Sequence, residues 1–137
     1  MPPTTGLYIA FYNDPDSVYK HWALFIDGPT HTDKTILNIM GSSTRYRFEM
    51  RTSNPRQEQN LLELFYLCDI DTSRISAIKH IAENEVVIHN EYPGYNCQDY
   101  VLEVLEELES RGIVDGDGDG GYGQRKEELV RRQEGLM

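Results

Sequence analysis

Cys97 has the sequence surroundings that most favour a nucleophile. It lies in YNCQDYVLEVLEEL, residues 95–108, where apolar residues recur at helical spacing and the glutamates fall on the opposite side. Pro93 and Gly94 predict a turn before this helix, and Asn96 is a typical N-cap residue. A thiol in the first helical turn faces unsatisfied N–H groups and the positive end of the helix dipole. We therefore expect a lowered pKa for Cys97, with N–H groups placed to hold an oxyanion.

The same spacing also supports a structural role for Cys97. Free cysteine is among the most buried residue types, and the helix face that carries Cys97 must be buried. That face consists of positions 97, 101, 104, 105 and 108. From periodicity alone both alternatives stay open. Cys68 and Cys97 are expected to be two free thiols, since a lone cysteine pair without a secretion signal rarely forms a disulfide.

A catalytic cysteine needs a base, normally a histidine that a third group orients. His21 opens the predicted strand HWALFID, and the polar residue Asn38 lies in the next predicted strand, TILNIMG. A hairpin centred near residues 29 and 30 places His21 directly opposite Asn38, with both side chains on one face. This predicts a set of Cys97, His21 and Asn38. An edge position for Asn38, facing water, is an equal alternative.

The other three histidines fit the role of base less well. His31 falls in the turn of the predicted hairpin, roughly 20 Å or more from His21 at ~3.3 Å per residue. His80 belongs to a predicted helix, and His89 precedes the Pro93 turn, where it is a lesser candidate. His21 is therefore the expected base.

Hydrophobic periodicity predicts the elements that must position these residues. Alternating and helical patterns favour an α+β fold, with an antiparallel sheet of about four to five strands packed against about three helices. The predicted strands are residues 7–12, 21–27, 35–41 and 46–51, with 85–89 as a short strand or an extended link. The predicted helices are residues 53–67, residues 72–84 and the segment from Cys97 to the stop at Gly112.

Two parts of the chain differ in composition. Residues 1–114 are predicted to form a single domain, and residues 115–137 to add an acidic Gly/Asp loop and a charged C-terminal helix or tail outside the core. The loop DGDGDGGYG matches the first half of an EF-hand calcium loop. The second half fails, because Lys126 stands where a bidentate glutamate is required. We therefore expect no metal site and no cofactor.

The charge balance argues against two classes of partner. The 137 residues include 23 acidic and 13 basic side chains, and the net charge of -10 repels phosphate backbones and anionic lipids. No stretch approaches the ~20 apolar residues of a membrane span. The start, MPPTTGLYIAFYND, lacks the basic and apolar segments of a secretion signal. We expect a cytoplasmic protein that binds no nucleic acid and has no membrane anchor.

Two blocks of the sequence resemble a known superfamily. HWALFIDG and YNCQDYVLEVLEEL look like the signature blocks of the circularly permuted papain-like superfamily, which includes the lecithin:retinol acyltransferase-like, NlpC/P60-like and PPPDE groups. In such blocks a histidine followed by Trp-Ala begins a strand, and an Asn-Cys pair begins a later helix. The resemblance covers about residues 7–113 and is closer still to small uncharacterised fungal members.

The resemblance implies a papain-like domain with Cys97 as nucleophile and His21 as general base. The expected activity is that of a thiol hydrolase or an acyl/amide transferase acting on a small-molecule or peptide substrate. Trp22, Asn96 and Gln98, which flank the pair in the two blocks, are expected to contact the substrate. The acyltransferase-like group usually carries a second histidine where this chain has Asn38, and asparagine orients the imidazole in ordinary papain-like sites.

Two other functions stay open. A papain-like scaffold that has lost its chemistry would be a non-catalytic binding module, whose Cys97 thiol reacts no faster than that of Cys68. A small accessory enzyme of a fungal biosynthetic pathway would instead use His21 and neighbouring tyrosines for acid-base isomerisation or cyclisation. Activity that survives Cys97→Ser but not His21→Ala would favour this third function.

Overall fold

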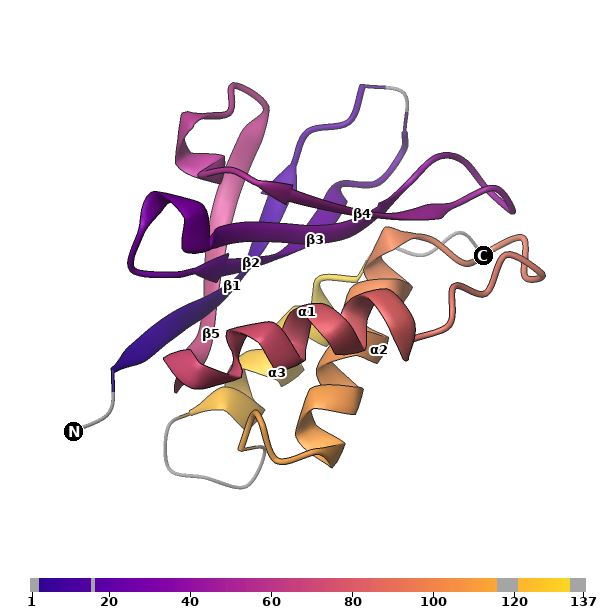
Figure 1. The fold of residues 1–137 in the computed structure, drawn as a ribbon. Coiled ribbons are helices and arrows are strands. Elements are labelled where there is room, and N and C mark those ends of the chain that lie inside the picture. The colour runs from indigo at the N-terminus through magenta and orange to yellow at the C-terminus, as the bar shows by residue number, and fades with distance from the viewer. Residues whose placement is uncertain (1–2, 16, 116–120, 134–137) are drawn as a thin grey trace.

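The computed structural model describes residues 3–15, 17–115 and 121–133, which form one sheet and three α-helices (Figure 1). The sheet has five antiparallel strands in the order β4-β3-β2-β1-β5. The strands are β1 (Thr4–Tyr12), β2 (His21–Asp27), β3 (Lys34–Met40), β4 (Arg47–Thr52) and β5 (Leu61–Asp71). The helices are α1 (Ile75–Asn84), α2 (Cys97–Ser110) and α3 (Tyr122–Arg131), with 3-10 turns at His31–Asp33, Pro55–Gln57 and Thr72–Arg74. The α+β class and the antiparallel sheet are as predicted.

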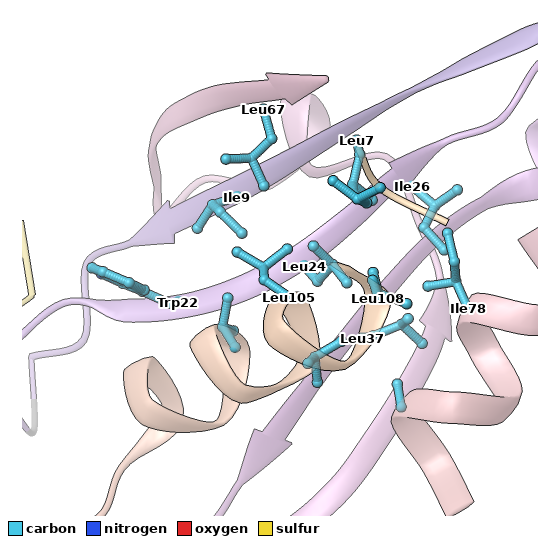
Figure 2. Packing of buried hydrophobic residues seen from close by; sticks show 14 of the residues in the cluster. Leu7, Ile9, Trp22, Leu24, Ile26, Leu37, Leu67, Ile78, Leu105 and Leu108 are labelled. Carbon is cyan, nitrogen blue, oxygen red and sulfur yellow. The ribbon is translucent and has the colours of Figure 1, made fainter. Parts of the chain in front are cut away.

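The helices cover one face of the sheet, and the main core lies between these two layers (Figure 1). Trp22, Leu24 and Ile26 of β2 belong to this core together with Leu105 and Leu108 of α2, and Leu24 lies beside Leu105 (Figure 2). These five side chains are at most 1% exposed. A second, smaller cluster lies on the other face and consists of Ala10, Tyr12, Ala23, Phe25 and Ile36. The central strand β2 is therefore buried on both faces.

The helix predicted over residues 53–67 is wrong. Asn54 does act as a cap, since its side chain accepts a hydrogen bond from the N–H of Arg56 at 3.1 Å, but the helical turn is only three residues long. The chain then forms β5, which pairs with β1 and buries Leu67 and Ile70. Pairing with β1 gives the backbone N–H and C=O groups of β5 hydrogen-bond partners. The stabilisation from this pairing and from side-chain burial outweighs the helical propensity of the segment.

The hairpin of β2 and β3 is shifted by two residues from the predicted register. Leu24 pairs with Leu37, so that by extension Asn38 stands opposite Ala23 rather than opposite His21. A shift of two residues leaves every side chain on its original face, whereas a shift of one would move it to the other face. His21 and Asn38 therefore still share a face of the sheet.

The charged helix predicted beyond residue 115 exists as α3, and it contributes to the core. Tyr122 and Leu129 are buried in the main cluster. The Tyr122 hydroxyl donates a hydrogen bond to Glu109 Oε2 at 2.7 Å, and Arg125 donates one to the carbonyl of Leu67 at 3.1 Å. The folded unit thus continues past residue 114 to include this helix.

Three further features of the chain complete the fold. Residues 85–89 do not form a strand: Glu85 lies in a turn, Val86 lies in a bend, and residues 87–89 have no regular structure. Residues 116–120, which hold most of the calcium-like pattern, lie outside the described residues. Within the described part of the chain no group of three or more His, Cys, Asp or Glu residues is placed to hold a metal ion, and no helix has the length and apolar character to cross a membrane.

Candidate functional site

Cys97 is the first residue of α2, and a capping box fixes this end of the helix. The Asn96 side chain accepts a hydrogen bond from the N–H of Gln98 at 2.8 Å, and the Asp99 carboxylate accepts one from the N–H of Asn96 at 3.0 Å. Gln98 Nε2 also donates to the carbonyl of Lys20 at 2.9 Å. The cap and this tether hold the start of α2 against the start of β2.

The sulfur of Cys97 lies against the backbone on both sides of His21. The N–H of Trp22 donates to Sγ at 3.4 Å, and the thiol faces the carbonyl oxygen of Lys20 at 3.9 Å. Burial raises the pKa of Cys97 to about 12, and hydrogen bonds from backbone N–H groups, that of Trp22 first, offset only part of this rise. The predicted lowering of this pKa is therefore wrong. The side chain is 3% exposed, and loss of solvation outweighs the field of the helix end.

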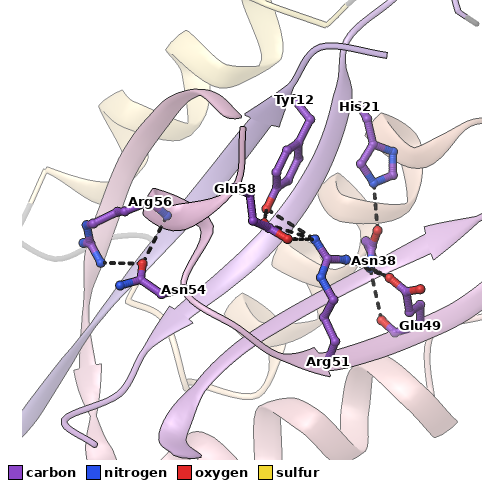
Figure 3. Close-up of polar contacts among 8 residues, drawn as sticks. All are labelled: Tyr12, His21, Asn38, Glu49, Arg51, Asn54, Arg56 and Glu58. Atoms are coloured by element: carbon purple, nitrogen blue, oxygen red, sulfur yellow. Dashed lines mark hydrogen bonds and ion pairs between the residues drawn. The ribbon is translucent and has the colours of Figure 1, made fainter. Parts of the chain in front are cut away.

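The imidazole of His21 is held by Asn38, as the sequence predicted (Figure 3). His21 Nε2 lies 2.7 Å from Asn38 Oδ1. The amide orientation follows from the other end of the group, because Asn38 Nδ2 donates to the carbonyl oxygen of Glu49 at 3.2 Å and to Glu49 Oε1 at 3.3 Å. An amide oxygen can only accept, so Nε2 carries the proton and Nδ1 holds the free lone pair of the neutral ring.

His21 is a neutral base at physiological pH. Burial lowers its pKa below 6.5, while the Asn38 hydrogen bond raises it in part. No hydrogen-bond partner for Nδ1 occurs among the described residues, and in the same part of the chain every fully buried side-chain nitrogen or oxygen has a partner. Nδ1 is therefore accessible, which is what proton transfer requires.

Polar contacts continue from Asn38 across the same face of the sheet (Figure 3). Glu49, the cross-strand neighbour of Asn38, pairs with Arg51 Nη1 at 2.7 Å, and Arg51 Nη2 pairs with Glu58 Oε2 at 3.0 Å. The Tyr12 hydroxyl donates to Glu58 Oε1 at 2.5 Å. Sequence reasoning did not select these residues. Polar side chains at alternate positions of RFEMRT were the signal that could have found Glu49 and Arg51.

The imidazole and the thiol reach the start of β2 from opposite faces of the sheet. His21 shares its face with Ala23 and Phe25 of the smaller cluster, whereas Cys97 belongs to the core beneath the helices. No hydrogen bond joins Sγ to the imidazole within the described residues. Both groups nevertheless line one cavity of about 690 Å³. Its other walls are residues 12–15, 17–19, 39–43, Tyr46 and Asn60.

Hydrogen bonds connect the cavity wall around Tyr46 to the segment that precedes Cys97. Asn90 Oδ1 accepts a hydrogen bond from the N–H of Tyr46 at 2.8 Å, and Asn90 Nδ2 donates to the Tyr46 carbonyl at 2.9 Å. The Ser43 hydroxyl donates to the carbonyl of Pro93 at 2.8 Å. Across the cavity the hydroxyls of Tyr19 and Tyr46 are 3.0 Å apart. The segment before α2 thus holds the wall of the cavity as well as Cys97.

The three residues expected to contact the substrate are at most 2% exposed. Asn96 and Gln98 form the cap and tether described above, and the Trp22 ring packs edge-on against Phe11 with ring centroids 5.4 Å apart. None of the three is among the described residues that line the cavity. Their observed contacts position Cys97 and β2.

The other histidines lie away from the cavity walls. His31 occupies the turn between β2 and β3. His80 is exposed and pairs with Glu85 at 3.3 Å, and His89 pairs with Glu91 at 3.1 Å. Of the four histidines, the cavity with Cys97 includes only His21.

Comparison with family models gives one match. Residues 7–115 match a family described as a family of unknown function, DUF6540. The matched segment contains the cavity, the cap of α2 and all five strands except the first residues of β1. The searches of curated proteins and of solved structures give no match.

Proposed function

The chain belongs to this DUF6540 family, and we propose that it is a cysteine-dependent hydrolase or acyl/amide transferase. Because the function of the family is unknown, the proposal is based on the chemistry of the site. The observation that carries the proposal is the single cavity lined by a thiol at a helix N-terminus and by an oriented neutral imidazole. We also propose a circularly permuted papain-like fold. The order of His21 before Cys97, on a central strand and on a helix packed against the sheet, supports it.

The raised pKa of Cys97 determines which mechanism is open to the site. Because burial raises the pKa of Cys97 to about 12, the thiolate is scarce at neutral pH. Attack by a preformed thiolate is therefore slow, and the thiol needs a base that removes its proton as the new bond forms. We assign this task to His21 Nδ1, which is unprotonated because Nε2 carries the ring proton in the hydrogen bond to Asn38.

In the proposed acylation step, Cys97 Sγ bonds to the carbonyl carbon of an amide, ester or thioester while its proton moves to His21 Nδ1. The carbonyl oxygen becomes an oxyanion, which the backbone N–H of Cys97 stabilises, since the capping box already uses the N–H groups of Gln98 and Asp99. When the tetrahedral intermediate collapses, the bond to the leaving group breaks and that group takes the proton from Nδ1. The products are an acyl-thioester on Cys97 and a neutral imidazole.

In the proposed deacylation step, water or an amine gives its proton to Nδ1 and attacks the thioester carbonyl. Collapse breaks the C–S bond, and the proton returns to the sulfur. Throughout both steps Asn38 keeps the hydrogen bond to Nε2, so that the same nitrogen, Nδ1, faces the reacting atoms. No residue of this scheme requires a cofactor.

A second candidate function has its own supporting observation. Sγ and the imidazole share no hydrogen bond in the described residues, and the thiol is 3% exposed. These features fit a non-catalytic binding module that keeps the cavity without the chemistry. The two candidates differ in whether His21 activates Cys97, and this difference is measurable without a known substrate.

The test is the pH dependence of the alkylation of Cys97 by iodoacetamide in a Cys68→Ala background. If His21 assists, the rate rises as His21 loses its proton, with a midpoint below 6.5, and then levels off well above the rate that a thiol of pKa about 12 gives alone. His21→Ala should remove this plateau and leave only the alkaline limb. His80→Ala is the matched control and should retain the plateau.

Coinciding profiles for the parent and His21→Ala would contradict catalysis by this pair and would favour the binding module. Intact-mass measurement confirms that the label is on Cys97. Circular dichroism of His21→Ala checks that the variant is folded, so that a lost plateau cannot be assigned to unfolding.

A further inference from the structure

The two edges of the sheet differ in what covers them (Figure 1). β5 pairs irregularly with β1 beside Leu67, whose carbonyl accepts a hydrogen bond from Arg125 of α3 at 3.1 Å. Irregular pairing and a covering helix both keep an edge strand from pairing with another chain. β4 forms the opposite edge and pairs with β3 in a continuous ladder from Arg47 to Thr52. β4 is therefore the more open edge.

Alternate residues of β4 direct their backbone groups away from β3. Before the strand, the N–H and C=O of Tyr46 bond to the side chain of Asn90 at 2.8 and 2.9 Å, so this residue faces outward. After the strand, the N–H of Ser53 donates to the C=O of Lys34 in β3 at 3.1 Å, so this residue faces inward. The two directions alternate along an antiparallel strand. Three residues of β4 thus direct both groups outward: Phe48, Met50 and Thr52.

The outward backbone groups of β4 are available to a further strand. Within the described residues no other group bonds to the outward N–H and C=O groups of these three residues. The Asn90 side chain closes the edge at Tyr46, so the open stretch is residues 48–52. Met50, which is 43% exposed, lies at its centre. An open edge of this kind can add a strand from another chain.

The open stretch is complementary to a second copy of itself. A two-fold axis through Met50, perpendicular to the sheet, places the stretch antiparallel to the same stretch of the second copy. Met50 then stands opposite Met50 of the second copy, and Phe48 stands opposite its Thr52. In this register the outward N–H and C=O groups of all three residues find partners. Glu49 of each copy stands opposite Arg51 of the other.

The charges of Glu49 and Arg51 select this register. A slip of two residues in one direction would place Glu49 opposite Glu49, and a slip in the other direction would place Arg51 opposite Arg51. Like charges directly opposite each other are destabilising. A slip of one residue would set outward backbone groups against inward ones. The register with Met50 on the two-fold axis is therefore the favoured one.

Both side chains can reach a second copy. The side chains of Glu49 and Arg51 are 36% and 33% exposed. Within the chain they meet through Glu49 Oε1 and Arg51 Nη1 at 2.7 Å, and Arg51 Nη2 bonds to Glu58. Glu49 Oε2 and Arg51 Nε have no hydrogen-bond partner among the described residues. These two atoms are left for the pairs between copies.

We infer that the chain forms a homodimer in solution, in which β4 pairs antiparallel with β4 of a second copy and the two sheets become one. The dimer is independent of the proposed function. It also adjoins the contacts that hold His21, since Glu49 Oε1 accepts a hydrogen bond from Asn38 at 3.3 Å.

The first test is sedimentation velocity over a range of concentrations. The unaltered chain should show a monomer–dimer equilibrium. Met50→Pro removes an outward N–H that β3 does not use, and proline is tolerated at such edge positions. Because each dimer loses two backbone hydrogen bonds, we expect its dissociation constant to rise by about tenfold or more. Met50→Ala is the matched control, which keeps the N–H and should retain the dimer.

The second test exchanges the charges. Glu49→Lys and Arg51→Glu each place like charges opposite each other in a homodimer, so each variant alone should be monomeric. An equimolar mixture should form a heterodimer, because the new lysine of one chain faces the new glutamate of the other. Circular dichroism checks that each variant is folded. A mixture of folded variants that stays monomeric would overturn the inference.

Amide hydrogen exchange of the unaltered chain needs no variant. The outward N–H groups should exchange more slowly as the concentration rises, whereas those of Glu49 and Arg51, which already face β3, should not change. A chain that stays monomeric at millimolar concentration would overturn the inference. A dimer that persists equally in Met50→Pro, or that does not slow exchange at Phe48, Met50 and Thr52, would assign the contact to another surface and would also overturn it.

Discussion

His21 Nε2 lies 2.7 Å from Asn38 Oδ1, although the two residues are not opposite each other in the ladder of β2 and β3. The contact is diagonal across neighbouring strands, and it determines which ring nitrogen is free. Burial lowers the pKa of His21, whereas this hydrogen bond raises it. Removing the hydrogen bond is therefore expected to lower the pKa of His21 further.

Replacing Asn38 should move the pKa of His21 in opposite directions according to the replacement. Asn38→Leu keeps the site buried but removes the acceptor, so we expect the pKa of His21 to fall. Asn38→Asp supplies a charged acceptor and should raise it. Titration of the imidazole by NMR measures both. The same shift for the two variants would show that the hydrogen bond does not control this ring.

Glu49 and Arg51 should have opposite effects on His21. The charge of Glu49 raises the pKa of His21 and that of Arg51 lowers it. We therefore expect Glu49→Gln to lower the pKa of His21 and Arg51→Gln to raise it. Loosening of the site would instead bring the pKa up toward 6.5 in both variants. A fall in Glu49→Gln, seen by the same NMR titration, is thus the diagnostic result.

The cap of α2 should matter more to stability than a cap elsewhere. Asn96→Ala removes half of the capping box and should cost about 1 kcal/mol in the free energy of unfolding, within a range of roughly 0.5–2. Asn54→Ala removes a similar side-chain cap, but from a 3-10 turn of three residues, and should cost less. Urea denaturation compares the two. An equal loss would mean that the start of α2 is held mainly by the Gln98 tether.

α3 should contribute to global stability. Leu129 is 0% exposed, so Leu129→Ala should lower the free energy of unfolding by about 2–5 kcal/mol. Its neighbour Val130 is 46% exposed, and Val130→Ala should change it by no more than about 0.5 kcal/mol. Urea denaturation of both variants gives the comparison. Two small effects would place α3 outside the cooperative unit.

Periodicity predicted the elements that position the site because each has a strong local signal. The alternation in residues 21–27 and the apolar stripe that follows Cys97 are set by which face each element buries. The pairing of His21 with Asn38 also followed, because face assignment survives a register error of two residues. Local pattern was therefore sufficient to predict the contact between His21 and Asn38.

The properties that sequence reasoning missed depend on distant parts of the chain. Residues 61–71 form β5 because β1 is available to pair with them, and no local signal reports that partner. The raised pKa of Cys97 comes from burial by segments far away in the sequence, such as Lys20, which precedes β2 and lies 77 positions before Cys97. A helix-end argument includes only the local field, and hence it gives the wrong sign.

The two-sided approach to the start of β2 has a consequence for how such a site can vary. The sulfur of Cys97 is surrounded by the core between the helices and the sheet, whereas the imidazole of His21 lies on the other face of the sheet. Substitutions in the core beneath α2 can therefore change the reactivity of the Cys97 thiol without changing the pKa of His21. Substitutions around Arg51 can change the pKa of His21 without changing the surroundings of the thiol. A chain with this arrangement can therefore change the surroundings of the thiol or those of the imidazole without changing the other.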